Sequence, residues 1–429
     1  MRRTSTLAAT AALTPLLVLG LAACGQSTGG ATADAQPESG PVTISYGIWD
    51  KNQVPAMQKI ADEFHAANPN VTVKIQVTPF KQYFTTLQTA AAGGGAPDVF
   101  WMNGPNVKLY AANQQLLPLD QTISRAKLDL AKYPEALVDL YTYDGKRYGI
   151  PKDFDTIGVW YNKALFDAKK LAYPKDTWTW ADFQSAARAL TDKTKGVYGA
   201  AAPVEDQAGF YDTIPSAGGQ VIDAAGTKSG FDSPEALQGI EFWTSLVKDG
   251  ASPTVQQMTD TSPGDMFKAG KVAMYWNGSW AAVEYSDVPE LKDAVNVAPV
   301  PAGPKGQVSV IHGLGNVIYA KTKHQDAAQK FVGFLGGERA AQIQADAGAV
   351  IPAYEGTQEA WVKSMPQFNL KAYVDEVATA VPYPASKNTK AWTTLQTDLL
   401  TKVWNGEVDA ATGLKDLATQ MNAALAKEK

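Results

Sequence analysis

Short apolar runs alternate with amphipathic segments along the chain from residue 42 onward. Residues 42–48 form an apolar run, and over 71–77 apolar and polar residues alternate, so both stretches predict β-strands. Between them, apolar residues recur at helical spacing from Val54 to Phe64, and Asn68 with Pro69 ends that helix. This succession of strand, helix and strand predicts a parallel sheet.

The pattern continues through the rest of the chain. A helix from residue 80 ends at the glycines 93–95, and a third strand is predicted over 98–102. A later helix begins at Ser233 and Pro234 and ends at Gly250, with Trp243 on its apolar stripe, so we expect Trp243 in a core. Further strands and helices are predicted at 157–161, 181–190, 317–320, 328–335, 392–403 and 414–425.

Residues 267–282 combine a strand, a turn and a helix start in one short stretch. The run 271–276 predicts a strand, Asn277 with Gly278 predicts a turn, and Ser279 is a candidate cap for a helix near Trp280. A tryptophan beside free backbone amides at a sheet edge suits a sugar ring, which has an apolar face and polar edges. The alternative is that Trp276 and Trp280 are ordinary core aromatics.

The composition indicates a globular protein of more than one lobe. The chain has 429 residues, of which 45% are hydrophobic and 19% charged, which is too long for a single ordinary core. Its net charge is −5 and it has no long basic run, so we expect no nucleic-acid partner.

The N-terminal residues predict export and a lipid anchor. Arg2 and Arg3 precede a short apolar stretch, and Leu21-Ala22-Ala23 comes directly before the single cysteine, Cys24. This arrangement resembles a bacterial lipobox, so residues 1–23 are interpreted as a signal peptide and Cys24 as the lipidated residue. Residues 24–40 are rich in Gly, Ser, Thr and Ala and are interpreted as a flexible lipoprotein tether.

Several kinds of chemistry find no support in the sequence. The three glycines 93–95 are not followed by the Lys-Ser/Thr pair of a phosphate-binding loop. No histidine has a second His or Cys at ligand spacing, so no metal site is predicted. There is no Gly-x-Ser-x-Gly motif, and we expect no catalytic residue and no cofactor.

Taken together and in this order, the motifs resemble extracellular solute-binding proteins of family 1, the substrate receptors of sugar ABC importers. The resemblance covers nearly all of the chain after the lipobox. It rests on 68–73 (NPNVTV), 95–99 (GAPDV), 148–151 (YGIP), 161–166 (YNKALF), 267–274 (FKAGKVAM), 277–280 (NGSW), and Gly348 with Pro352.

The resemblance implies a two-lobed, periplasmic-binding-protein-like α/β fold with a ligand cleft between the lobes. Chain segments that act as hinges would join the two lobes. It assigns residues 41–153 and 311–370 to the N-terminal lobe, 157–300 and 371–429 to the C-terminal lobe, and 154–156 and 301–310 to the hinge crossings.

The resemblance also implies a set of ligand-binding residues. Trp280 and Trp392 match stacking aromatics of the family, and Glu205 with Tyr211 match an acidic and an aromatic residue of a loop in the second lobe. The full set is Trp49, Asp50, Lys51, Trp101, Asn103, Asp155, Glu205, Tyr211, Asn277, Trp280, Gly313 and Trp392.

These residues favour a neutral sugar as ligand. Carboxylates and amides hydrogen-bond hydroxyl groups, and none of the arginines after the signal peptide lies in these loops. With the lipobox, the resemblance implies an extracytoplasmic monomer, attached to the membrane through the lipid alone, that passes its sugar to the transmembrane permease subunits of an ABC importer. Two alternatives stay open: an anchored carbohydrate-active enzyme using two of Asp50, Asp155 and Glu205, or a receptor for peptide, polyamine or metal.

Overall fold

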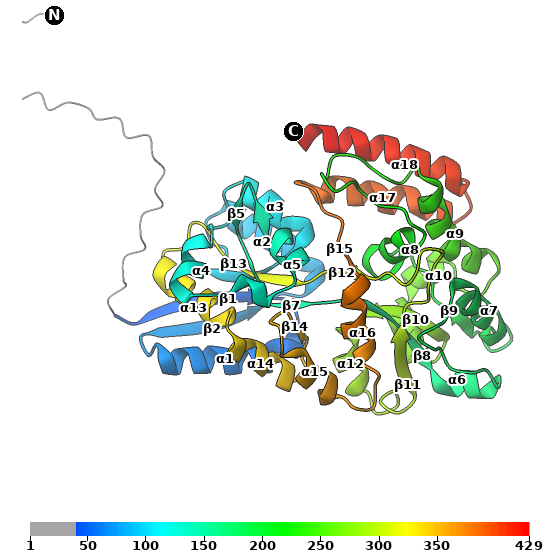
Figure 1. The fold of residues 1–429 in the computed structure, drawn as a ribbon, viewed down its shortest axis with the longest axis horizontal. Helices are drawn as coiled ribbons and strands as arrows, with labels where there is room; N and C mark the ends of the chain where they lie inside the picture. Colours follow the sequence, from blue (N-terminus) through cyan, green and yellow to red (C-terminus); the bar gives the residue numbers. More distant parts are fainter. Residues whose placement is uncertain (1–39, 429) are drawn as a thin grey trace, which may run out of the picture. The chain divides into compact units, whose positions relative to one another are not determined.

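Two α/β lobes, each built around its own sheet, make up the folded part of the chain (Figure 1). The computed structural model describes residues 40–428, which belong to one compact unit. The predicted signal peptide, Cys24 and the tether up to residue 39 lie outside the described residues. The two-lobed α/β fold expected from the sequence is confirmed.

The first lobe contains a mixed sheet with the strand order β2-β1-β3-β13-β6. β1 pairs in parallel with β2 and with β3, as the strand–helix–strand pattern predicts. β13 comes from much later in the chain and lies antiparallel between β3 and β6. The strands are β1 (Val42–Ile48), β2 (Val71–Val77), β3 (Val99–Asn103), β6 (Ile150–Pro151) and β13 (Leu314–Ile318).

Helices cover both faces of this first sheet. On one face, α1 and α14 bury Met57, Ile60 and Ile343 in a core shared with Ile44 and Tyr46 of β1. On the other face, α2 and α3 form a second core with β3 and β13. The helices are α1 (Val54–Ala67), α2 (Phe80–Ala92), α3 (Gly104–Ala112), α13 (Gln325–Leu335) and α14 (Glu338–Asp346).

The second lobe contains a sheet with the order β11-β8-β10-β9. Every residue of β8 is buried because helices cover the sheet on both sides, and β8 pairs antiparallel with both β10 and β11. The strands are β8 (Ile157–Asn162), β9 (Tyr198–Ala200), β10 (Val272–Gly278) and β11 (Val295–Pro299).

Helices α7, α9 and α18 of the second lobe begin at a residue whose side chain caps them. Ser233 accepts a hydrogen bond from the Ala236 amide and Pro234 occupies the first turn of α9, as predicted. Thr179 and Asp182 form a reciprocal capping box at the start of α7. The helices are α7 (Trp180–Leu190), α8 (Tyr211–Ser216), α9 (Pro234–Lys248), α12 (Ala281–Ser286), α16 (Lys371–Asp375), α17 (Thr389–Trp404) and α18 (Ala410–Leu425).

Short strand pairs connect the two lobes. β7 (Asp153–Phe154) pairs with β14 (Ile351–Pro352), and β12 (Val310–Ile311) pairs with β15 (Val381–Pro382). Between these pairs, Asp155 and His312 exchange backbone hydrogen bonds of 2.7 and 3.1 Å. The segments 154–156 and 301–310 predicted as hinges lie in or next to these pairs, and the lobe bounds themselves stay a prediction.

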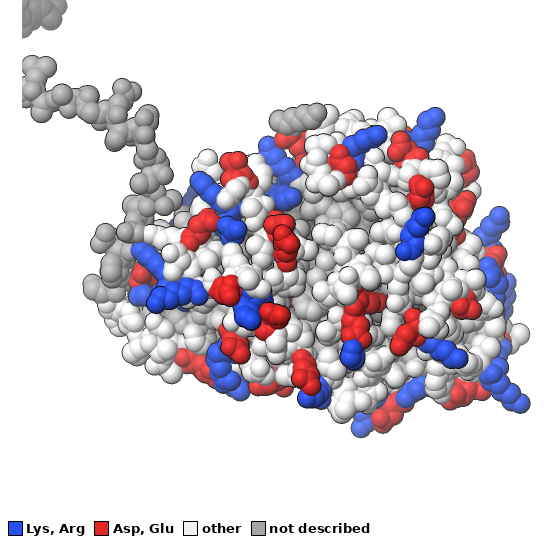
Figure 2. Space-filling model, viewed as in Figure 1, with Lys and Arg blue, Asp and Glu red and all other residues white. Residues whose placement is uncertain are grey.

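The other helices and strands are short. No helix within residues 40–428 has the length and apolar character needed to cross a membrane. Lys, Arg, Asp and Glu side chains are interspersed over both lobes on the face shown in Figure 2. The short elements are α4 (Asp120–Ala126), α5 (Glu135–Leu140), β4 (Thr142–Tyr143), β5 (Lys146–Arg147), α6 (Lys163–Ala168), α10 (Val255–Asp260), α11 (Pro263–Lys268) and α15 (Gln358–Ser364).

Replacing Trp243 by alanine is expected to destabilise the second lobe strongly. Its indole is buried, lies 4.8 Å from the Trp276 ring and donates a 3.2 Å hydrogen bond to Thr213. Trp243→Ala leaves a large cavity and should lower the free energy of unfolding by about 3–5 kcal/mol in denaturant titrations. Trp178→Ala, at a half-buried position, is the control; an equal loss in both variants would contradict the assignment of Trp243 to the core.

Candidate functional site

Aromatic side chains gather at the end of β1 in the first lobe. Trp49 packs edge-on against Tyr83 and Trp101, with ring centroids 4.9 and 5.2 Å apart. Phe80 and Phe84 of α2 contact the same indole, and Phe80 is 56% exposed. The sequence analysis did not select these two phenylalanines as site residues. Their exposed faces, with the half-buried Trp49, form an apolar surface next to Asp50.

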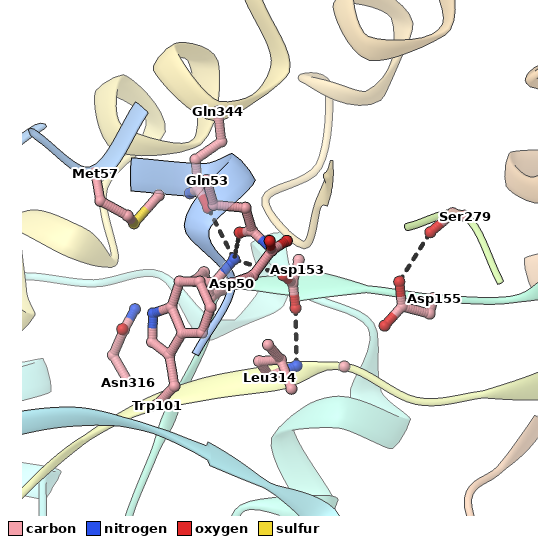
Figure 3. Close-up of polar contacts among 12 residues, drawn as sticks. Asp50, Gln53, Met57, Trp101, Asp153, Asp155, Ser279, Leu314, Asn316 and Gln344 are labelled. Carbon is pink, nitrogen blue, oxygen red and sulfur yellow. Dashed lines mark hydrogen bonds and ion pairs between the residues drawn. The ribbon is translucent and has the colours of Figure 1, made fainter. Parts of the chain in front are cut away.

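A buried ammonium group orders the polar residues beside this surface (Figure 3). Lys152 Nζ donates to Gln53 Oε1 at 2.8 Å, to Asp153 Oδ2 at 2.5 Å and to Gln344 Oε1 at 3.2 Å. Gln53 in turn donates to Asp50 Oδ2 at 3.0 Å. Asp50 is thereby held in one orientation at the start of α1. Sequence reasoning did not find Lys152, because no local pattern distinguishes it from a surface lysine.

Trp101 packs beneath this network, and neither face of its ring is exposed to solvent. Its side chain is 0% exposed, and Lys152 Nζ lies 4.5 Å from its ring centroid. The indole N–H donates to the Tyr46 hydroxyl at 2.6 Å, which donates to Asn316 Oδ1 at 2.7 Å. The predicted contact of Trp101 with ligand is not supported, because protein covers both sides of the ring.

Asn103, His312 and Gly313 meet where β3 ends and the second crossing enters the first lobe. Asn103 is buried and accepts a 2.8 Å hydrogen bond from Asn106. A Cβ atom on Gly313 would lie 2.2 Å from the Asp153 carbonyl oxygen, so only glycine fits there. The His312 Nε2 atom accepts from the Gly104 amide at 3.2 Å, and burial lowers the pKa of this imidazole to about 4.

The corner between β10 and α12 differs in detail from the prediction. β10 extends through Gly278, so Asn277 and Gly278 belong to the strand, and α12 begins at Ala281. Ser279 does not cap this helix, because its hydroxyl donates instead to Asp155 Oδ1 at 2.8 Å. This bond ties the corner to the first crossing segment.

Trp280 is an exposed aromatic at this corner. Its side chain is 38% exposed, whereas Trp276, in β10, is buried. A Cβ atom on Gly278 would lie 2.0 Å from the Trp280 ring, so the indole rests directly on the glycine backbone. Nearby, Asn277 accepts from the Gly278 amide at 2.9 Å and donates weakly to Tyr285 at 3.4 Å. The corner therefore presents one face of Trp280 in a fixed position.

Asp155 is a buried carboxyl group at the junction of the lobes. Burial and, to a smaller extent, the neighbouring Asp153 carboxylate raise its pKa to about 7, against the opposing effects of the Ser279 hydrogen bond and of Lys152. Only 9% of the residue is exposed. Near neutral pH the group is therefore divided between its carboxyl and carboxylate forms, and can both donate and accept hydrogen bonds.

Glu205 carries a second carboxyl group with a raised pKa, on the second lobe. Desolvation by the surrounding protein, together with charge repulsion from and a hydrogen bond with the adjacent Asp206, raises its pKa to about 8. The residue nevertheless stays exposed to solvent. Asp206 itself accepts a 2.9 Å hydrogen bond from the Tyr383 hydroxyl.

Tyr211 and Trp392 do not reach the surface. Tyr211 is 1% exposed and donates to Gln396 at 2.9 Å, and Trp392 is 0% exposed and donates to Ser386 at 2.8 Å. Both belong to the core of the second lobe. Their predicted contact with a ligand is not supported, because α17 turns the Trp392 face inward. The predicted residues that remain available at the surface are Trp49, Asp50, Lys51, Glu205, Asn277 and Trp280, with Asp155 just beneath it.

Solved structures with the same architecture are two-lobed substrate-binding proteins of sugar ABC transporters. The substrate-binding protein Lmo0181 of Listeria monocytogenes, in complex with cycloalternan, has a TM-score of 0.84 and 28% identity, covering 90% of this chain and 99% of that one. The GacH receptor of Streptomyces glaucescens, solved unliganded and with acarbose, has a TM-score of 0.81 and 25% identity, covering 91% of this chain and 100% of that one.

The family follows from the sequence comparison. The family model described as bacterial extracellular solute-binding protein matches residues 50–342, so the chain belongs to this family and the predicted resemblance is confirmed. Among curated relatives, the maltodextrin-binding protein MdxE of Bacillus subtilis is 26% identical over 428 residues, covering 95% of this chain and 93% of that protein. The matched family and relatives are binding proteins.

Asp155→Asn is expected to flatten the pH dependence of stability between about pH 4 and pH 7. The folded protein keeps the Asp155 proton up to a pKa of about 7, whereas an unfolded aspartate releases it near pH 4, so wild-type stability falls as pH rises through this window. The lost stability is on the order of a few kcal/mol. Asparagine stays neutral and can still accept from Ser279.

Urea unfolding at several pH values between 4 and 8 measures this effect. Asp416→Asn, on the exposed side of α18, is the matched control and should retain the wild-type profile. If Asp155→Asn and wild type lose stability in parallel as pH rises, Asp155 does not carry a proton into the neutral range.

Proposed function

We propose that this protein is the sugar receptor of an ABC importer, and that it binds an oligosaccharide between its lobes without chemically changing it. The observation that carries the proposal is the exposed Trp280 indole, fixed on Gly278 at a corner that is hydrogen-bonded to Asp155. The exposed aromatic surface of Trp49 and Phe80 supports it from the first lobe.

The chemistry of these groups matches that of a neutral sugar. Aromatic rings accept the apolar C–H face of a pyranose, while carboxyl and amide groups bond its hydroxyls. Asp155 and Glu205 carry raised pKa values, so near neutral pH each can act as hydrogen-bond donor as well as acceptor. A sugar hydroxyl group also both donates and accepts hydrogen bonds. The donors and acceptors of the sugar can therefore be matched by those of the protein.

The names of relatives suggest which sugars to test first. MdxE is named for maltodextrin, Lmo0181 was solved with cycloalternan and GacH with acarbose. Other relatives are named for arabino- and galactooligosaccharides. We therefore propose an oligosaccharide ligand, with α-linked glucose oligomers as the leading class.

Ligand capture in this proposal is a hinge motion of the lobes. The β7–β14 and β12–β15 pairs join the lobes, and the Asp155–Ser279 bond links the first crossing to the Trp280 corner. A sugar that contacts both lobes favours the closed arrangement because it gains contacts there that the open one lacks. The closed receptor then delivers its ligand to the transmembrane permease.

A thermal-shift screen of maltodextrins, cyclic glucans, and arabino- and galacto-oligosaccharides tests this function. A ligand that binds only the folded state raises the melting temperature with concentration. Stabilisation by a sugar, with no reducing ends released on long incubation, supports the receptor. If no sugar stabilises the protein while a peptide, polyamine or metal ion does, the sugar assignment is wrong; release of reducing ends would establish an enzyme instead.

Trp280→Ala should weaken sugar binding while leaving the fold largely intact. The lost stacking face is expected to cost about 2 kcal/mol of binding free energy, roughly a 30-fold rise in Kd. Calorimetric titration with the best sugar of the screen measures it. Trp243→Ala is the matched control, because it removes a buried indole, and it should bind like wild type under conditions where it is folded. Wild-type affinity in Trp280→Ala would exclude this corner as the site.

The proposed location is extracytoplasmic, with a lipid on Cys24 as the membrane attachment of a monomeric receptor. Cys24→Ser should abolish incorporation of a labelled fatty acid and move the protein from the membrane fraction to the soluble fraction. Ser27→Ala, three residues away in the same segment, should keep both label and membrane attachment. Fatty-acid labelling of Cys24→Ser would refute the anchor.

A further inference from the structure

A basic pocket lies on the first lobe, at the edge of the sheet where β1 and β2 begin. It encloses about 250 Å³. Thr43 and Ser45 of β1 form part of its wall, and Lys74 of β2 projects from the neighbouring strand. The segment after β13 completes it with Lys321 and Lys323.

Within residues 40–428, the lysines of this pocket have no ion-pair partner. Lys74, Lys321 and Lys323 are all exposed. The pocket contains one carboxylate, Asp98. It accepts from the Ser45 amide at 2.8 Å, from the Ser45 hydroxyl at 2.7 Å and from Thr322 Oγ1 at 2.5 Å. These three bonds hold the carboxylate in place, and the three lysines of the lining outnumber its single negative charge.

The start of α13 adds a further preference for negative charge. His324 occupies the N-cap position of this 11-residue helix and lines the pocket, and it supplies no side-chain capping bond. The first turn therefore presents amide N–H groups and the positive end of the helix dipole. Asp326 in that turn is paired with Lys330 at 2.7 Å. Three lysines and a helix start around one cavity suit a phosphate group.

We propose that this pocket binds the phosphate of an anionic lipid headgroup at the membrane surface that the receptor is anchored to. The choice of a lipid rests on the lipid anchor proposed for Cys24. Cys24 lies 18 residues before Val42, where β1 begins at the rim of the pocket. Even a fully extended chain of that length spans only about 60 Å. The anchor therefore keeps this end of the lobe within about 60 Å of the lipid phosphates.

The location of the pocket also defines the orientation of a docked receptor relative to the membrane. β1 runs from Thr43 and Ser45 in the pocket wall to Ile48, directly before Trp49 and Asp50. The pocket and the candidate sugar site thus lie at opposite ends of the same strand. A receptor docked through its lysines holds the sugar site away from the lipid and toward the sugar outside. To bring its sugar site to a permease in the membrane, the receptor must first dissociate from the lipid headgroups and reorient.

Vesicle binding tests the proposal without the anchor. Residues 24–429 carrying Cys24→Ser retain the whole compact unit, which begins at Pro37. This protein should co-sediment with vesicles of phosphatidylglycerol and phosphatidylcholine in equal parts, and not with phosphatidylcholine alone. Because each lysine near an anionic surface contributes about a fivefold gain in partitioning, the triple variant Lys74→Gln/Lys321→Gln/Lys323→Gln should lose well over tenfold.

A charge-matched variant separates the pocket from net charge. Lys169→Gln/Lys175→Gln/Lys415→Gln changes the same number of exposed lysines on the second lobe and should keep wild-type vesicle binding. An equal loss in both triple variants would overturn the pocket as a specific site. Lysine-dependent binding of inorganic phosphate without vesicle binding would identify a free-anion site and overturn the lipid assignment. Since lipidation of Cys24 is measured separately, failure of the anchor is distinguishable from failure of the pocket.

Discussion

A single buried ammonium group determines the arrangement of the site end of the first lobe. An unpaired charge in a protein interior is very costly, so Lys152 requires Gln53, Asp153 and Gln344 around it at the same time. These partners come from the start of α1, the first crossing and α14. The network thereby fixes Asp50 at the surface and covers one face of Trp101 from within. The exposed aromatic surface of Trp49 and Phe80 therefore rests on a support that the Lys152 hydrogen bonds hold rigid.

The site combines many acidic groups with little effective charge. Asp155 and Glu205 have raised pKa values because the protein withholds water from them and places another carboxyl group beside each. Near neutral pH they behave partly as neutral carboxyl groups, and Asp153 is neutralised by Lys152. Such a site avoids the repulsion that a row of carboxylates would exert, and it does not require a cationic ligand. This electrostatic arrangement is consistent with an uncharged, hydroxyl-rich solute.

The local elements were predictable, whereas the exposure of individual side chains was not. β1, β2, α1 and α9 follow from short-range periodicity and caps, and Trp280 was selected from the turn beside it. The stacking role predicted for Trp392 was unsupported because the packing of α17 determines which way that ring faces. Ser279 was assigned as a cap because sequence cannot show that Asp155, 124 residues earlier, competes for its hydroxyl. Phe80 shows the reverse error. An apolar residue of an amphipathic helix is normally buried, whereas the structure leaves Phe80 exposed.

The position of β13 has a consequence for the order in which the chain can fold. This strand fills the gap between β3 and β6, although its partner residues Asn103 and Leu314 are more than two hundred positions apart in sequence. The first sheet cannot be completed until most of the chain has been synthesised, because β13, which joins β6 to β3, does not exist before then. Contacts of such long range also form slowly. A chain whose first lobe is completed late remains unfolded for longer. This delay suits a protein that crosses a membrane before it folds.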